Sequence, residues 1–421
     1  MKKIVILSLL LTWTLSSQDY YYSKYAPFNE NIKTPEEFLG YPIGEMHTRH
    51  DLIVSYMEYL SDISDKAQVF YYGNTYEKRK LLILAISSTE KISTLEEIRE
   101  KHISYIDPDH PNYNSEAKPS DFPVIINLGY GVHGNEPSSS EAALLTAYTL
   151  VSSQSDEIKN YLSQSVILLD PTINPDGRDR HTHWANTYKG SPLVDDPQDA
   201  EHNEYWPGGR TNHYWFDLNR DWYLAIHPES RGKLNWYHTW QPNVTTDFHE
   251  MGSNSTYFFV PFKPNGSLNP VIPKENYNYF NFLFGSYYAR ALDKIGTLYF
   301  TREVYDRTYP GYGSSYPDYL GGIGILFEQA SSRGHKQKTQ FGEITFPFTI
   351  RNQYISGMTT VMASVENKES LQDYQGKFFK SAITEANQKK IKGYTFDLGK
   401  DRNKTKAFID KLKIHDIKVL R

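Results

Sequence analysis

The chain has 421 residues and a formal net charge of −5 at pH 7. It is long enough for one large domain or two smaller ones, and its charge does not favour binding to nucleic acid or another polyanion. Hydrophobic residues make up 39% of the sequence, which is sufficient for a core. There is no cysteine, which excludes disulfides, thiolate metal sites and lipid attachment at an N-terminal cysteine.

Residues 1–17 have the pattern of a secretory signal peptide. Two lysines follow the first methionine, residues 4–11 form an apolar stretch too short to span a bilayer, and Ser16 and Ser17 offer small residues for cleavage. No later run is apolar enough for a membrane helix. The sequence therefore predicts an exported protein, periplasmic or extracellular, without an integral membrane segment.

Apolar periodicity predicts an alternation of helices and strands through most of the chain. The predicted helices include residues 46–65, a helix that begins at Glu141, residues 156–163 and residues 228–240. The predicted strands are residues 68–72, 80–86, 123–128, 165–170, 243–248 and 323–327. Several of these strands are branched apolar runs of the kind that is buried in a parallel sheet.

Two segments do not follow this alternation. Residues 187–215 form a long polar and aromatic insertion, and irregular segments of this length are more often functional than not. Residues 376–421 are predicted to contain a strand over 394–398, a helix over 404–412 and a strand over 416–420. We therefore expect a catalytic domain over residues 18–375 and the start of a second, truncated α/β domain after it.

Polar side chains follow four of the predicted strands, at the point where each strand ends. His133 and Glu136 follow the strand at 123–128, and Asn174, His249 and Glu328 follow three later strands. Open α/β sheets place their ligand sites at the carboxyl ends of strands. The recurrence predicts that these residues share one rim of the sheet.

Three of these residues form a set that suits zinc. A catalytic zinc ion takes three protein ligands and leaves one position for water, and His133, Glu136 and His249 supply that number. Asp217 could accept the far N–H of a ligand histidine and so fix its tautomer. The alternatives are hydrogen-bonded structural histidines and a capping role for Asp217.

Two other histidine patterns are weaker. His249-Glu250 begins like the H-E-x-x-H motif, but Ser253 stands where the second histidine is required, and the stretch leaves a strand rather than lying on a helix. His181 and His183 form an H-x-H pair without an obvious third partner.

A general base and an anion-binding group are also present. Glu328 leaves an apolar strand, where partial loss of water raises the pKa of a carboxyl group toward neutrality and suits a general base. Its alternative role is an ion pair with Arg333. Arg220, beside Asn219, could bind a carboxylate in fork geometry, and its alternative is a salt bridge with a neighbouring aspartate.

Together these residues resemble the zinc metallocarboxypeptidase family. The resemblance rests on five motifs, which occur in the family's order between about residues 120 and 335: His133-Gly-Asn-Glu136, Asn174-Pro-Asp-Gly177, Asp217-Leu-Asn219-Arg220, and His249 and Glu328, each after a strand. The family's mobile tyrosine corresponds best to Tyr305 by spacing and local pattern, with Tyr309 second.

The resemblance implies a three-layer α/β/α sandwich around a mixed, mostly parallel twisted sheet. It implies one zinc ion per chain, with peptide or protein C-termini as substrates. Asn219 and Arg220 would hold the terminal carboxylate of the substrate. Zinc would polarise the scissile carbonyl and activate water, while Glu328 would take the proton of that water and pass it to the leaving amine. Tyr305 would act beside Glu328.

The sequence also departs from the family. Asn135 stands inside H-x-x-E, where the family often has arginine, and Ala185 follows Trp184, where the family has the arginine that steadies the oxyanion. Arg180, or Arg210 from the insertion, could replace that arginine. Two alternatives stay open: a zinc amidase acting on cell-wall peptides or N-acyl amino acids, and an inactive peptide-binding homologue.

Overall fold

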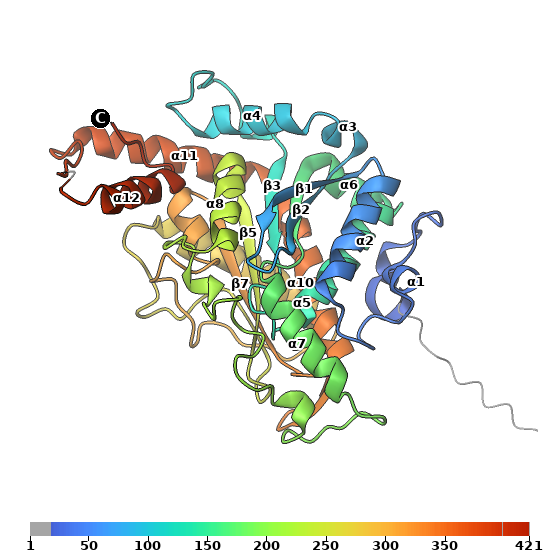
Figure 1. Ribbon diagram of the computed structural model, residues 1–421. Coiled ribbons are helices and arrows are strands. Elements are labelled where there is room, and N and C mark those ends of the chain that lie inside the picture. Colours follow the sequence, from blue (N-terminus) through green and yellow to red (C-terminus); the bar gives the residue numbers. More distant parts are fainter. Residues whose placement is uncertain (1–17, 398, 421) are drawn as a thin grey trace, which may run out of the picture.

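Seven strands form one mixed sheet at the centre of the computed structural model, which describes residues 18–397 and 399–420 (Figure 1). The strand order is β1–β2–β4–β3–β5–β7–β6. The four strands β4, β3, β5 and β7 run parallel, and β1, β2 and β6 pair in antiparallel fashion at the two edges. The strands are β1 (Ala67–Asn74), β2 (Lys80–Ile86), β3 (Val124–Gly129), β4 (Ser165–Asp170), β5 (Val244–Met251), β6 (Tyr257–Phe259) and β7 (Ile323–Ala330).

Helices cover both faces of this sheet, so the predicted α/β/α sandwich is confirmed (Figure 1). One face packs against α2 (His50–Ile63), α5 (Ser138–Ser152), α6 (Asp156–Gln164), α9 (Asn281–Lys294) and α10 (Phe346–Glu366). The other face packs against α3 (Thr89–Ile92), α4 (Leu95–Ile106) and α8 (Pro228–Trp240). Successive side chains of β3 point to opposite faces of the sheet. Ile126 and Leu128 therefore enter the core on the first face, and Ile125 enters the core on the second.

The remaining elements lie around these layers. They are α1 (Pro35–Leu39), α7 (Pro175–Tyr188), α11 (Lys368–Gln388), α12 (Arg402–Ile414) and a hairpin of β8 (Lys336–Thr339) and β9 (Gly342–Thr345). Within the described residues, no helix is long and apolar enough to cross a membrane. The predicted signal peptide, residues 1–17, lies outside the described residues, and export stays a prediction.

The connections between strands open a crevice at the carboxyl ends of β3 and β5. From β3 the chain passes through α5 and α6 to β4, on one side of β3. From β4 it passes through α7 and α8 to β5, on the other side of β3. Such a reversal of strand order is the position at which open α/β sheets bind ligands.

Two expected strand ends differ from the structure. His249 and Glu328 lie inside β5 and β7 rather than after them, because these strands stay paired through His249 and Glu328. Asn174 does not lie in an open loop. Its side chain accepts the N–H of Gly177 at 3.0 Å and caps α7, which then begins at Pro175.

The C-terminal region contains α12 but neither expected strand. The described residues at 394–397 and 416–420 are irregular, so both strand predictions are wrong; residue 398 lies outside the description. In the part of the chain that the structure describes, no partner strand lies beside them, and an isolated strand is not stable. Instead, α12 lies beside α8 (Figure 1), and the His415 ring approaches the Tyr316 hydroxyl at 2.7 Å. The expected boundary at 375 falls inside α11, and a second domain stays a prediction.

Candidate metal centre and active site

The loop between β3 and α5 brings His133 and Glu136 to the crevice. It packs so tightly against the start of α7 that only glycine fits at position 134. A Cβ added to Gly134 would lie 2.1 Å from the backbone nitrogen of Arg178. Gly131 adopts a φ of 67°, which glycine tolerates better than other residues. The loop therefore presents both side chains on a fixed backbone.

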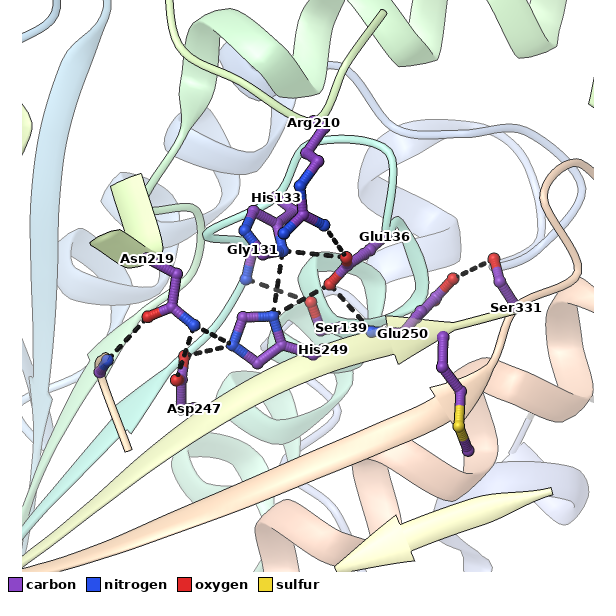
Figure 2. Close-up of polar contacts among 12 residues, drawn as sticks. Gly131, His133, Glu136, Ser139, Arg210, Asn219, Asp247, His249, Glu250 and Ser331 are labelled. Atoms are coloured by element: carbon purple, nitrogen blue, oxygen red, sulfur yellow. Dashed lines mark hydrogen bonds and ion pairs between the residues drawn. The ribbon is translucent and has the colours of Figure 1, made fainter. Parts of the chain in front are cut away.

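His133, Glu136 and His249 converge with their donor atoms facing one another (Figure 2). His133 Nδ1 lies 2.9 Å from Glu136 Oε1 and 3.1 Å from His249 Nδ1, and His249 Nδ1 lies 3.0 Å from Glu136 Oε2. All three side chains are buried. Two imidazoles and one carboxylate are a donor set that zinc accepts, so the residues fit the metal that the sequence predicted.

The far nitrogens of both histidines are held by carboxylates. His133 Nε2 lies 2.8 Å from Asp217 Oδ1, and His249 Nε2 lies 2.8 Å from Asp247 Oδ1. Such contacts fix which ring nitrogen faces the metal. Burial raises the pKa of Asp217, but hydrogen bonding to His133 and the charges of His133 and Arg210 outweigh it and hold that pKa below its ordinary value. The carboxylate therefore stays ionised.

Asp247 was missed in the sequence. It stands two residues before His249 on the same strand, and residues two apart on a strand point to the same face. This spacing of two residues could have predicted Asp247 as the partner of His249. In addition, the backbone N–H of Glu250 donates to Glu136 Oε2 at 2.9 Å, so β5 orients the ligand carboxylate as well as supplying a ligand.

Glu328 lies beside His249. The two residues are paired in register across β5 and β7, which places their side chains on the same face of the sheet. Both line a cavity of about 360 Å³ that also contains His133 and Glu136. Burial raises the pKa of Glu328 to about 8. A carboxyl group with this pKa can both accept and return a proton near neutral pH.

The structure distinguishes the two arginine candidates. Arg210 lines the cavity, with Nη1 at 3.1 Å from Glu136 Oε1 (Figure 2). Its Nη2 lies 2.8 Å from Asp217 Oδ2. Arg180 turns away and donates from Nη2 to the backbone carbonyls of Thr211 and Asn212. The Arg180 guanidinium therefore holds the insertion, and the substrate-binding role predicted for Arg180 stays a prediction.

Asn219 and Arg220 both line the cavity, on a short 3₁₀ turn (Leu218–Arg220). The Asn219 amide accepts the N–H of Gly313 at 2.7 Å, and its nitrogen lies 2.9 Å from His249 Nε2. The Arg220 side chain is 44% exposed, and its guanidinium lies 4.6 Å from the centre of the Tyr312 ring. Arg220 therefore keeps donors available to a ligand, while Asn219 uses its amide within the protein.

The two candidate tyrosines occupy different places. Tyr305 lines the cavity, and its hydroxyl lies 3.5 Å from the sulfur of Met251. Tyr309 donates from its hydroxyl to the backbone carbonyl of Arg220 at 2.9 Å and is not a cavity residue. The arrangement favours Tyr305 as the tyrosine that faces a ligand.

Comparisons with known proteins identify a family by sequence and only distant neighbours by structure. The sequence model of a family described as zinc carboxypeptidase matches residues 53–287, more than half of the chain. A search of curated proteins found no match. A metallo-carboxypeptidase from Burkholderia cenocepacia is similar in structure at a TM-score of 0.48 and 13% identity, over 74% of this chain and 68% of that chain. Carboxypeptidase A from Helicoverpa armigera has a TM-score of 0.49 and 15% identity, over 81% and 77%.

These structural similarities are distant, and the family assignment rests on the sequence match. That match includes His133, Glu136 and His249, which the fold gathers at the crevice between β3 and β5. The chain belongs to the zinc carboxypeptidase family.

Proposed function

We propose that this chain is an exported zinc-dependent carboxypeptidase that releases the C-terminal residue of peptides or proteins. The observation that carries the proposal is the shared cavity: Glu328 lies beside the His133, Glu136 and His249 ligand set, and Arg220 lines the same space. A base, a metal-binding set and an anion-binding group within about 360 Å³ suit a reaction on a bond close to a carboxylate.

Several side chains that line the cavity have separate roles in this reaction. Arg220 pairs with the terminal carboxylate of the substrate and so selects the last peptide bond. His133, Glu136 and His249 would hold the zinc ion, which would supply Lewis-acid activation of the scissile carbonyl and of an attacking water. Glu328 accepts the proton of the water and returns it to the leaving amine. Tyr305 lines the cavity, and the Asn219 amide donates to Asp247 at 3.2 Å and so supports the carboxylate that holds His249.

Arg210 replaces the oxyanion arginine whose usual position is Ala185. Its guanidinium already faces the cavity from the insertion, beside Glu136 and Asp217. A guanidinium at this place stabilises negative charge that develops on the substrate carbonyl oxygen.

The test compares zinc-loaded protein on two peptides that differ only in a free or an amidated C-terminus, with products identified by mass spectrometry. We expect release of one residue from the free acid and none from the amide. Equal hydrolysis of both would identify an amidase, and hydrolysis of neither would identify a binding protein; either result would overturn the proposal.

A variant pair tests the anion-binding group. Arg220→Gln should raise KM for the free acid more than it lowers kcat. Arg290→Gln is the matched control, because Arg290 also lies 4.6 Å from a tyrosine ring, that of Tyr287, but on α9, away from the cavity. An Arg220→Gln enzyme with unchanged KM would exclude the assigned role.

A further inference from the structure

A second cluster of metal-binding side chains lies outside the active site. His47 precedes α2, Glu201 lies on a 3₁₀ turn (Ala200–His202) in the insertion, and His335 lies between β7 and β8. Each is only 1% exposed. One donor atom from each lies within 4.8 Å of the others, the same limit that the active-site ligands satisfy.

Several polar atoms of this cluster lack a protein partner. Among the described residues, neither ring nitrogen of His47 has a hydrogen bond, nor do Glu201 Oε2 and His335 Nε2. The other oxygen of Glu201 is held by His335, which approaches it with its backbone nitrogen at 2.7 Å and its Nδ1 at 2.5 Å. Unsatisfied polar atoms are costly in a protein interior, and buried ones generally have a partner. A bound cation would provide a partner for these unsatisfied atoms.

The surroundings hold the cluster in place. The His47 ring stacks on Phe346 at 4.0 Å between centroids, and the Asn186 side chain hydrogen bonds to both the backbone nitrogen and the carbonyl of His47. A Cβ added to Gly334 would lie 2.3 Å from Glu201 Oε1, so glycine permits the close approach of His335 and Glu201.

We propose that His47, Glu201 and His335 bind a second divalent metal ion of the zinc class, distinct from the ion at the active site. Two imidazoles and a carboxylate are donors that zinc and its neighbours accept. The full burial of the three residues is consistent with a structural ion rather than a second catalytic one.

The second ion would stabilise the insertion on which the active site depends. Its ligands come from three segments that are far apart in sequence, and one of them lies in the insertion. Glu204, three residues after Glu201, accepts from the Asn135 side chain at 2.6 Å and from the Gly209 N–H at 3.0 Å. Asn135 lies between the ligands His133 and Glu136, and Gly209 precedes Arg210. Binding at the second site therefore fixes the segment that places Arg210 beside Glu136.

The test is the zinc content of the full chain, measured by elemental analysis after dialysis against metal-free buffer. Wild type should hold two zinc ions per chain, rather than the single ion that the family resemblance implies. His133→Ala should hold one, His335→Ala should hold one, and the double variant should hold none. His183→Ala is the matched control, because this exposed histidine on α7 belongs to neither cluster, and it should still hold two.

A second measurement does not depend on how well the His335→Ala variant folds. Zinc added to metal-free His133→Ala should raise its Tm, because a ligand that binds only the folded state stabilises it. If His133→Ala takes up no zinc and its Tm does not respond, the second site is excluded and the cluster is a hydrogen-bonded group of buried histidines. Failure of the proposed active site is a separate result, in which wild type and His335→Ala lack peptide hydrolysis whatever the metal count.

Discussion

His133 and His249 each engage both ring nitrogens, and this arrangement fixes their orientation at the active site. In each ring Nδ1 faces the metal-binding centre, while Nε2 contacts Asp217 in one case and Asp247 in the other. Each ring is thereby limited to one orientation and one tautomer. The carboxylates also make each imidazole a better electron donor to a metal.

Glu229 gives a prediction about pH and stability. It lies buried in the first turn of α8, where burial and the nearby Asp176 and Asp221 raise its pKa to about 7 from an ordinary value of 4.5. Because the folded pKa lies above the unfolded one, the protonated residue contributes full stability below about pH 4.5. That contribution falls as the pH rises through 7, by about 3 kcal/mol in total.

Glu229→Gln should remove this loss. In urea unfolding measured between pH 4.5 and pH 8, the variant should gain stability relative to wild type as the pH rises. Glu369→Gln, at an exposed glutamate in the first turn of α11, serves as the control and should follow wild type. A constant difference between Glu229→Gln and wild type across this range would show that Glu229 does not titrate there.

The sequence was sufficient to select a candidate ligand set that the fold brings together, but not all of the partners of these residues. His133, Glu136 and His249 stand at or near the ends of short apolar runs, a signal that is local in sequence. The choice between Arg180 and Arg210 was not local, because it depends on how the insertion folds back over the loop after β3. The second cluster was not predicted at all, since His47, Glu201 and His335 share no local pattern.

At the scale of elements, the loop from β3 to α5 is the part of the site with the least freedom. Arg178, buried at the start of α7, donates from Nη1 to the backbone carbonyl of Pro137 at 2.7 Å and pairs with Glu141. Together with the close approach at Gly134, these contacts join the loop to α7. The geometry of the metal site thus depends on the packing between two connections.

Gly134→Ala should disrupt this packing. Its added methyl group would meet the backbone of Gly177 and Arg178 at 2.1 Å, so the loop must move, at a cost of about 1–3 kcal/mol. We expect zinc binding at the active site to weaken or disappear. Gly252→Ala is the control, because no atom lies within 4 Å of the added Cβ there. Normal zinc content and stability in Gly134→Ala would contradict the described loop.

Element boundaries were predicted less well than the elements themselves. All six predicted strands of the central sheet occur, because buried apolar runs are a strong signal. Strands β5 and β7 continue into polar residues because each stays paired with the other. The same dependence on neighbouring strands explains the error near the C-terminus, where the segments at 394–397 and 416–420 have no strand to pair with among the described residues.

At the scale of the whole molecule, the active site forms where the chain reverses its direction across the sheet. The loop after β3 provides two of the candidate ligands, β5 provides the third, and β7 provides Glu328, so three neighbouring strands deliver the proposed ligands and base. The insertion adds Arg210 from outside the sheet. The proposed second ion would join this insertion to the N-terminal segment and to the loop after β7.

The most direct measurement of the central claim is the rate of hydrolysis of a peptide with a free C-terminus by zinc-loaded wild type and Glu328→Gln. Glutamine keeps the shape of the side chain but cannot accept the proton of water, and combined base and acid catalysis contributes on the order of 10³ in rate. We predict that the variant keeps its zinc and loses a factor of ~10³ or more in kcat. A variant that holds zinc and hydrolyses the peptide within tenfold of wild type would contradict the account.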